Sequence, residues 1–360
     1  MCTRNDVIQK FSADVVPAMD KVIVLDGALD KQLSRNMPHI SETDEVLAMR
    51  ALMYDQDAVY KAHLDFLRAG AQIIRTNTYR TTISLFPSAF GLPICICDQT
   101  RVITAVALAK KAVRKYFEEI GGDSNNIEDY NQRRPLIAGC CDGYNFLPFY
   151  DVGKITKELP ISQLLSFHEE RIDILVRSGV DILAFESISC LIEVIAISQA
   201  LRKYPTIRVW ITFLCKMNGD LLDDNLLITA IMLCKETLPG QLMAVGVECQ
   251  YIASSLEPIR TLMRNINNFK DWVFPFLFYI DKNHLSTMTV PVDAAGPSRP
   301  VQPVAQWLDI GVRYVGGGFG TNAEDIKEIC REVDYYRISR GEMFATLMTC
   351  SAQNKNLSKM

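Results

Sequence analysis

Residues 243–249 read Met-Ala-Val-Gly-Val-Glu-Cys, a short apolar run that ends in an acid and a thiol. Strands of a parallel sheet are covered on both faces, so they occur in a sequence as short and nearly continuous apolar runs. Similar runs recur along the whole chain, with stretches of helical periodicity between them. This alternation predicts successive β-α units around a parallel sheet.

Eight runs of this kind are candidate strands. They are Val22–Leu25, Ile73–Thr76, Leu136–Gly139, Ile182–Phe185, Val209–Phe213, Met243–Val247, Phe274–Tyr279 and Tyr314–Val315. Helices are expected between them, for example at Asp98–Ile120, Ser162–Ser178 and Cys190–Tyr204, where apolar residues recur every three or four positions. Eight units suit a chain of 360 residues, whereas a doubly wound sheet needs fewer strands and an early Gly-x-Gly-x-x-Gly turn. We therefore predict an α/β fold, a (β/α)8 TIM barrel that forms a single domain.

The ends of the chain and two internal segments are expected to lie outside the ring of helices. We expect an N-terminal extension over residues 1–20, the barrel over 21–336 and a C-terminal tail over 337–360. Gly121–Arg134 is rich in Asn and Asp and predicts a surface excursion. Ser286–Pro303 carries four prolines and predicts a loop. The polar end from Thr346 onward is expected to be frayed.

Composition limits the kind of partner. A net charge of -4 without a long basic run predicts neither nucleic acid nor an acidic membrane as a partner. No stretch approaches the roughly 20 apolar residues that a membrane span needs. Eleven cysteines, an odd number without framework spacing, together with an N-terminus that lacks an apolar signal core, predict a reduced, cytoplasmic protein. The expected ligands are small molecules.

Polar residues gather where the predicted strands end, which is where a barrel carries its reactive groups. The motifs are Asp26-Gly27, Thr76-Asn77-Thr78-Tyr79, Gly179-Val180-Asp181 with Glu186-Ser187, Trp210 and Phe213 with Cys215-Lys216, and His168 with Arg171 on the helix before. Taken together over about residues 20 to 335, these motifs resemble the homocysteine S-methyltransferase family. Ala28 departs from the family's Asp-Gly-Gly strand end.

The resemblance implies a set of substrate-binding residues. These are Asp26, Gly27, Thr76, Asn77, Thr78 and Glu186. Asp26 and Glu186 would face the amino group of homocysteine, since an ammonium needs acceptor-only partners. The alternative is that Asp26 caps a loop and Glu186 pairs with a nearby Lys or Arg. Thr76, Asn77 and Thr78 suit a carboxylate or a loop scaffold equally. His168, beside two glutamates, is expected to be a structural or surface residue.

The resemblance also implies a zinc ion that is held by three cysteines. Cys249 matches the first of them, but Gly318 and Phe319 occupy the positions of the other two when the glycine run is aligned on Gly316-Gly317. A single thiolate cannot hold zinc at useful affinity. We therefore predict that zinc, the cofactor of the family, is absent or weakly bound here and that Cys249 is a remnant.

The other cysteines leave an alternative open. Cys140, Cys141 and Cys215 also stand at strand ends and could form a rearranged site with Cys249, although small buried thiols are more often part of the core. Further departures from the family, at Cys140, Asp142-Gly143, Glu248 and Ile280-Asp281, are spread over several strand ends. Two of these departures, Glu248 and Asp281, add negative charge, which disfavours a thiolate.

These residues are consistent with two main functions. The resemblance implies methyl transfer from S-methylmethionine or S-adenosylmethionine, a sulfonium donor, to homocysteine, giving methionine. The loss of two zinc cysteines opposes this activity, and the alternative is a non-catalytic relative that binds a metabolite or a partner. A third hypothesis, phosphate binding at the amides of residues 316–321, is opposed by Glu324 and Asp325, which follow closely.

Overall fold

The structure is a computed structural model that describes residues 21–37, 47–79, 98–144, 160–216, 219–248, 261, 275–282 and 303–357. For residues 341–357 it describes the backbone alone. The predicted N-terminal extension, the remnant ligand Cys249 and nearly all of the proline-rich segment lie outside the described residues. Of that segment only Pro303 is described, and it begins a helix.

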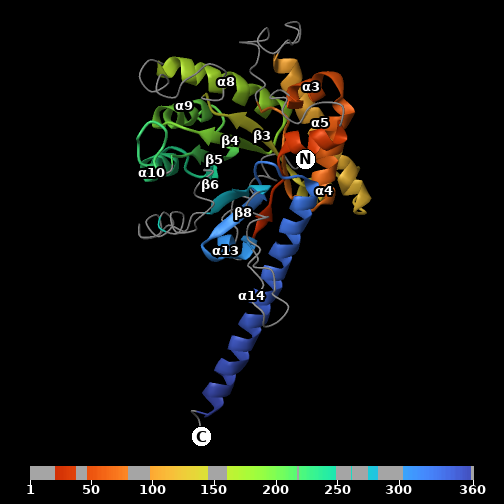
Figure 1. Ribbon diagram of the computed structural model, residues 1–360, viewed down its shortest axis with the longest axis vertical. Helices are drawn as coiled ribbons and strands as arrows, with labels where there is room; N and C mark the ends of the chain where they lie inside the picture. Colours follow the sequence, from red (N-terminus) through yellow and green to blue (C-terminus); the bar gives the residue numbers. More distant parts are fainter. Residues whose placement is uncertain are drawn as a thin grey trace, which may run out of the picture.

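Eight parallel strands form the sheet, as predicted (Figure 1). They are β1 (Ile23–Val24), β2 (Ile73–Arg75), β3 (Leu136–Asp142), β4 (Ile182–Ile188), β5 (Arg208–Leu214), β6 (Leu242–Glu248), β7 (Phe276–Ile280) and β8 (Val312–Gly317). Their order is β1-β8-β7-β6-β5-β4-β3-β2. A parallel bridge between Leu25 and Ile73 joins the first strand to the second. The sheet is therefore a barrel, and the predicted (β/α)8 fold is confirmed.

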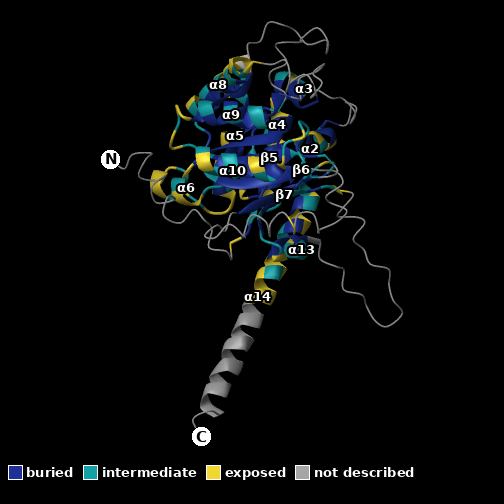
Figure 2. Cartoon of the chain, turned by 90° about the vertical axis from the view of Figure 1, so that its left-hand side faces the viewer, coloured by how far each residue is buried: buried dark blue, intermediate teal, exposed yellow. Residues whose placement is uncertain are grey.

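Helices surround the strands, and most of them bury one face against the barrel (Figures 1 and 2). They are α2 (Leu29–Asn36), α3 (Leu47–Tyr54), α4 (Gln56–Arg68), α5 (Asp98–Glu119), α6 (Ile127–Arg133), α8 (Ile161–Ser178), α9 (Leu191–Leu201), α10 (Leu227–Thr237), α13 (Pro303–Asp309) and α14 (Ala323–Leu357). The helix α6 lies at the surface, and most of α14 projects away from the barrel. The three helices predicted from periodicity correspond to α5, α8 and α9.

The core has two layers because successive residues of a strand point to opposite faces. The inner layer fills the barrel and consists of residues such as Leu25, Ile73, Trp210, Leu277 and Tyr314, each nearly or fully buried. The outer layer lies between the strands and the helices and is made of other strand residues and the apolar faces of the helices. Because apolar side chains fill the interior of the barrel, polar side chains are expected at the carboxyl ends of the strands.

Two surface segments that were expected to lie outside the ring contain helix. The excursion Gly121–Arg134 is exposed, as expected, but contains the helix α6, whose start is capped by the Asn126 side chain accepting a hydrogen bond from the Asp129 N–H at 3.2 Å. The segment from Thr346, expected to be frayed, is helical as far as Leu357, because α14 continues to that residue and projects from the barrel (Figure 1). No proline interrupts α14, and a single glycine costs a helix only about 1 kcal/mol.

Candidate functional site

A polar layer lies on top of the apolar inner core. On four strands the residue two positions after a core residue is polar: Arg75 follows Ile73, Cys140 follows Ala138, Glu186 follows Ala184 and Tyr279 follows Leu277. Residues two apart on a strand share a face, so these side chains enter the barrel at its carboxyl end. We call the set of Asp26, Arg75, Cys140, Glu186, Glu248 and Tyr279 the polar layer.

Arg75 is the centre of the polar layer. Its Nε donates to Asp26 Oδ1 at 2.8 Å, and its Nη1 donates to both carboxylate oxygens of Glu186 at 3.2 Å. Its Nη2 donates to the Gly27 carbonyl oxygen at 2.9 Å, and its backbone N–H donates to Asp26 Oδ2 at 2.7 Å. The structure thus brings the predicted residues Asp26, Gly27 and Glu186 together, but around an arginine of the chain itself.

Tyr279 and Cys140 complete the surroundings of this ion pair. The Tyr279 ring lies 4.5 Å from the Arg75 guanidinium carbon, and its hydroxyl donates to Glu186 Oε1. Cys140 Sγ lies 3.3 Å from Glu186 Oε2. Burial raises the pKa of Tyr279 and of Cys140 well above their ordinary values, so both groups are protonated and act as donors to the carboxylate.

Burial shifts the pKa values of the charged side chains in the polar layer. Burial raises the pKa of Asp26, an effect that Arg75 opposes through its charge and hydrogen bonds. Although burial works against a charged guanidinium, Asp26 and Glu186 raise the pKa of Arg75 well above its ordinary value. Arg75 therefore stays charged inside the barrel.

Glu248 forms a second acidic position next to Glu186. Its carboxylate accepts a hydrogen bond from the Ser187 N–H at 3.0 Å and further ones from the Ser187 and Thr212 hydroxyls. Burial and the charge of Glu186 raise the pKa of Glu248, while these hydrogen bonds lower it. Ser187 has a φ of 60°, a strained backbone conformation of the kind that is common at functional sites.

The three residues that follow β2 are bonded to the scaffold. The Thr76 and Thr78 hydroxyls lie 2.7 Å apart, and the Thr78 hydroxyl donates to the Cys140 carbonyl oxygen at 2.7 Å. The Cys140 N–H donates to the Thr76 hydroxyl at 3.1 Å, and the Asn77 amide donates to the Ala48 carbonyl oxygen at 2.9 Å. These contacts fit the loop-scaffold alternative, and a substrate-binding role for Thr76, Asn77 and Thr78 stays a prediction.

His168 and Arg171 are both buried inside the α8 side of the fold. His168 Nε2 lies 2.9 Å from Glu193 Oε1, which also accepts the Tyr144 N–H at 2.6 Å. Arg171 pairs with Asp142. His168 therefore links α8 to α9, which agrees with the structural role expected from the sequence.

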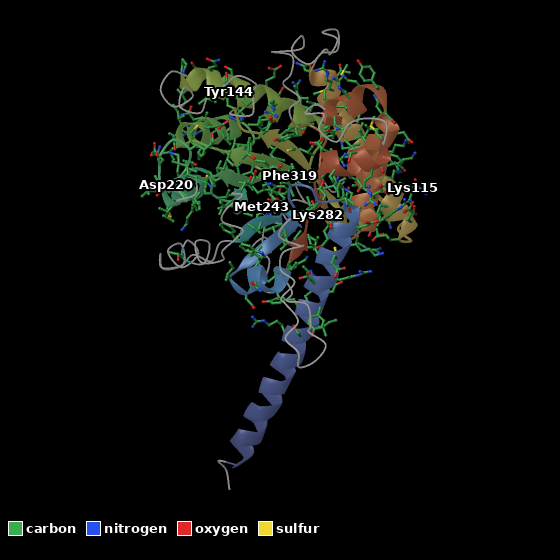
Figure 3. The ribbon with its side chains drawn as sticks, viewed as in Figure 1. Lys115, Tyr144, Asp220, Met243, Lys282 and Phe319 are labelled. Atoms are coloured by element: carbon green, nitrogen blue, oxygen red, sulfur yellow. The ribbon has the colours of Figure 1, made fainter. Side chains whose placement is uncertain are left out.

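The end of β8 offers no side chain that could ligate a metal. A Cβ atom at Gly318 would overlap the carboxylate of Asp281, whose Oδ1 accepts the Phe319 N–H at 2.6 Å. Phe319 is 81% exposed and lies beside Lys282, whose N–H donates to the Phe319 carbonyl oxygen at 3.0 Å (Figure 3). The residues present at Gly318 and Phe319 do not fit a zinc site.

The other cysteines do not converge within the described residues. Cys140 faces the barrel interior, whereas Cys141 and Cys215 belong to the outer core layer. Burial raises the pKa of Cys141 to about 12, which opposes the thiolate form that a metal requires. In the described ranges, no three His, Cys, Asp or Glu residues are grouped so as to hold a metal ion. No helix in these ranges has both the length and the apolar character for crossing a bilayer.

Comparison with known proteins gives the family. The family model of homocysteine S-methyltransferase matches residues 23–333. The chain belongs to the homocysteine S-methyltransferase family. Relatives include the betaine-homocysteine S-methyltransferase of Drosophila melanogaster, 26% identical over 91% of this chain and 98% of that protein. A homocysteine S-methyltransferase of Bacillus subtilis is 28% identical over 86% of this chain and 93% of that protein.

Solved structures support the fold of this family member. The metallated form of a homocysteine methyltransferase from Escherichia coli has a TM-score of 0.67, with 24% identity, 89% of this chain covered and 98% of that chain. Its apo form has a TM-score of 0.62 with 22% identity and covers 87% of this chain and 96% of that chain. Similarity at this identity extends to the barrel and not to the function of single residues.

Arg75 and Tyr279 are site residues that the sequence does not single out, and Arg75 is the more informative of the two. It lies inside an apolar run that was interpreted only as a strand, and a charged residue there was a usable signal because buried charges are almost always paired. The alternation of faces after Ile73 directs Arg75 into the barrel. The alternative that Glu186 pairs with a nearby Lys or Arg agrees with the observed contact at 3.2 Å.

Proposed function

We propose that this chain is a member of the homocysteine S-methyltransferase family that does not transfer methyl groups by zinc-thiolate chemistry. It acts instead by binding a small molecule at the polar layer. The observation that supports this proposal most strongly is the pair Gly318 and Phe319. A Cβ atom at the first position would overlap the Asp281 carboxylate, and the second position carries an apolar ring in solvent.

The chemistry explains why these two positions matter. A free thiol titrates near pH 8.5, so at neutral pH most homocysteine carries a protonated sulfur. Zinc bound by three thiolates with an open fourth position holds a substrate sulfur as thiolate. Cys249 alone would supply one ligand, and Cys140, with its raised pKa, is protonated. We therefore derive no methyl-transfer step through zinc for this chain.

The acidic residues of the polar layer agree with this proposal. Asp26, Glu186 and Glu248 bring three carboxylates to the barrel end and Arg75 brings one cation. A net excess of carboxylates disfavours the formation of a thiolate close by. In a (β/α)8 barrel, small molecules usually bind at the carboxyl ends of the strands. A cytoplasmic location stays a prediction from cysteine usage.

The competing function is methyl transfer from S-methylmethionine or S-adenosylmethionine to homocysteine. The names of the relatives favour methyl transfer to homocysteine but not a sulfonium donor, since the Drosophila melanogaster protein is named for betaine and the Bacillus subtilis protein for homocysteine alone. The competing function requires a metal site that includes residues other than Gly318 and Phe319. Such a site would have to combine Cys249 with Cys140, Cys141 or Cys215.

One experiment separates the two functions. Freshly purified full-length protein is incubated with homocysteine and each sulfonium donor, and methionine is measured by mass spectrometry. The homocysteine methyltransferase of Escherichia coli serves as the positive control. We expect no methionine above the rate without protein. Methionine formation that depends on added zinc and is lost in a Cys249→Ser variant would establish the competing function.

A further inference from the structure

The guanidinium of Arg75 is enclosed by groups that would bind any small cation. Two carboxylates, one carbonyl oxygen and one aromatic face surround it, from Asp26, Glu186, Gly27 and Tyr279. Side-chain exposure is 17% for Arg75, 2% for Asp26 and 7% for Glu186. Paired carboxylates and an aromatic ring are the groups that proteins use to hold ammonium and guanidinium ligands.

The donors of Arg75 are directed at the protein. Nε, Nη1 and Nη2 each donate to an oxygen of Asp26, Glu186 or Gly27. A ligand carboxylate would therefore meet a guanidinium whose charge is already balanced by two acids. A ligand ammonium would have to displace the guanidinium, which is attached to the same chain and so competes at a high effective concentration.

We propose that Arg75 is a built-in occupant of a cation subsite made by Asp26, Glu186, Gly27 and Tyr279. It determines specificity by excluding ligands that carry a primary ammonium, including α-amino acids, from this part of the polar layer. The inference rests on the proposed function and deepens it, because it states which class of small molecule the wild-type chain rejects. Shortening of the Arg75 side chain turns the subsite into a receptor for a free cation.

The test uses the variant Arg75→Ala and methylguanidinium as the probe, with binding measured by calorimetry and by thermal shift. Arg134→Ala is the matched control, because Arg134 also pairs with an acid, Asp181, and its side chain is 16% exposed. We expect Arg75→Ala to bind methylguanidinium roughly tenfold or more tightly than the wild type does. Arg134→Ala should bind methylguanidinium no more tightly than the wild type does.

A matched pair of thiols tests the exclusion of amino acids. L-homocysteine carries an ammonium, and γ-mercaptobutyrate is the same molecule without it. We expect Arg75→Ala to gain affinity for L-homocysteine but none for γ-mercaptobutyrate, since the freed carboxylates attract an ammonium and repel the other ligand. The wild type should bind L-homocysteine no better than γ-mercaptobutyrate.

Loss of the cation could prevent the Ala variant from folding, because it leaves two buried acids without a partner. In that case refolding with millimolar methylguanidinium is expected to restore the native circular dichroism spectrum. Arg75→Lys, which keeps the charge, is a second variant and should exclude L-homocysteine as the wild type does. Failure of methylguanidinium to restore an unfolded Ala variant, or tighter binding of L-homocysteine to Arg75→Lys than to the wild type, would count against the proposal.

The outcomes distinguish this inference from the proposed function. Saturable binding of L-homocysteine to the wild type without methionine formation would overturn the role of Arg75 and leave the proposed function intact. Zinc-dependent methionine formation would overturn the proposed function. Equal affinity of wild type and Arg75→Ala for methylguanidinium would overturn the inference whatever the methyl-transfer assay shows.

Discussion

Gly318 and Asp281 are packed so closely that a Cβ atom at position 318 would overlap the Asp281 carboxylate. This carboxylate also accepts the Phe319 N–H at 2.6 Å and so fixes the turn after β8. The carboxylate thus takes up the space that a cysteine side chain at 318 would need. A cysteine at position 318, which the resemblance to the family implies, would therefore require Asp281 to move.

We predict that Gly318→Cys destabilises the protein by about 1–3 kcal/mol, because the new side chain forces Asp281 to move. The change is measured as the free energy of unfolding in urea. Phe319→Cys is the control, and at an exposed position it should alter stability by less than about 0.5 kcal/mol. Addition of Asp281→Ala to Gly318→Cys should recover part of the loss. Additive effects of these two substitutions would contradict the close packing.

We predict that Arg75→Ala lowers the free energy of unfolding by about 3–5 kcal/mol, the usual cost of removing one partner of a buried ion pair. Arg134→Ala should cost clearly less, because the side chain of its partner Asp181 is 21% exposed. Both values come from urea unfolding of the full chain. Similar losses of stability in the two variants would contradict the prediction. They would show that Arg75 contributes no more to stability than Arg134 does at the opposite end of the barrel.

Glu332 on α14 should make stability fall as the pH rises. Burial raises its pKa from 4.5 to about 7, so the folded protein holds a proton that the unfolded chain has released. The free energy of unfolding therefore decreases between pH 4.5 and about 7. Glu332→Gln should raise the melting temperature at pH 8 and leave it nearly unchanged at pH 4.5. The exposed Glu328, changed to Gln, is the control, and an equal effect of Glu332→Gln at both pH values would contradict this assignment.

His63 on α4 should make the stability of the protein fall as the pH drops, which is the opposite of the effect of Glu332. It is fully buried, its ring nitrogens have no hydrogen-bond partner within the described residues, and burial lowers its pKa from 6.5 to about 4. The unfolded chain therefore binds a proton that the folded protein excludes. The free energy of unfolding falls as the pH drops from 6.5 toward 4, by about 3 kcal/mol in total. His63→Leu should remove this slope in urea unfolding. A slope that persists would assign acid sensitivity to other groups.

The fold could be predicted from the sequence because each strand is a short apolar run that is buried on both faces. Burial of Trp210 and Leu277 inside the barrel follows directly from that pattern. The contact of Arg75 with Asp26 and Glu186 was not accessible, because the pattern gives the order of the strands but not which ends meet across a closed barrel. The length of α14 was missed because polar composition was given more weight than the absence of helix-breaking proline.

Three of the predicted site residues lie together, but Arg75 and Tyr279 were not predicted, and the substrate-binding roles stay predictions. Asp26, Gly27 and Glu186 lie together, as the resemblance implies, but their common partner is an internal guanidinium. Thr76 and Asn77 are bonded to backbone groups, which a sequence cannot reveal because their partners, Cys140 and Ala48, are distant in the chain. The roles depend on contacts between strand ends that only the closed barrel creates.

The most direct test of the account is the zinc content of each chain, measured by inductively coupled plasma mass spectrometry on freshly purified, chelator-free protein. The homocysteine methyltransferase of Escherichia coli, known in a metallated form, is purified in parallel as the reference. We predict clearly substoichiometric zinc in this protein under conditions that load the reference. Stoichiometric zinc that is lost on replacing Cys249 with serine would contradict the account.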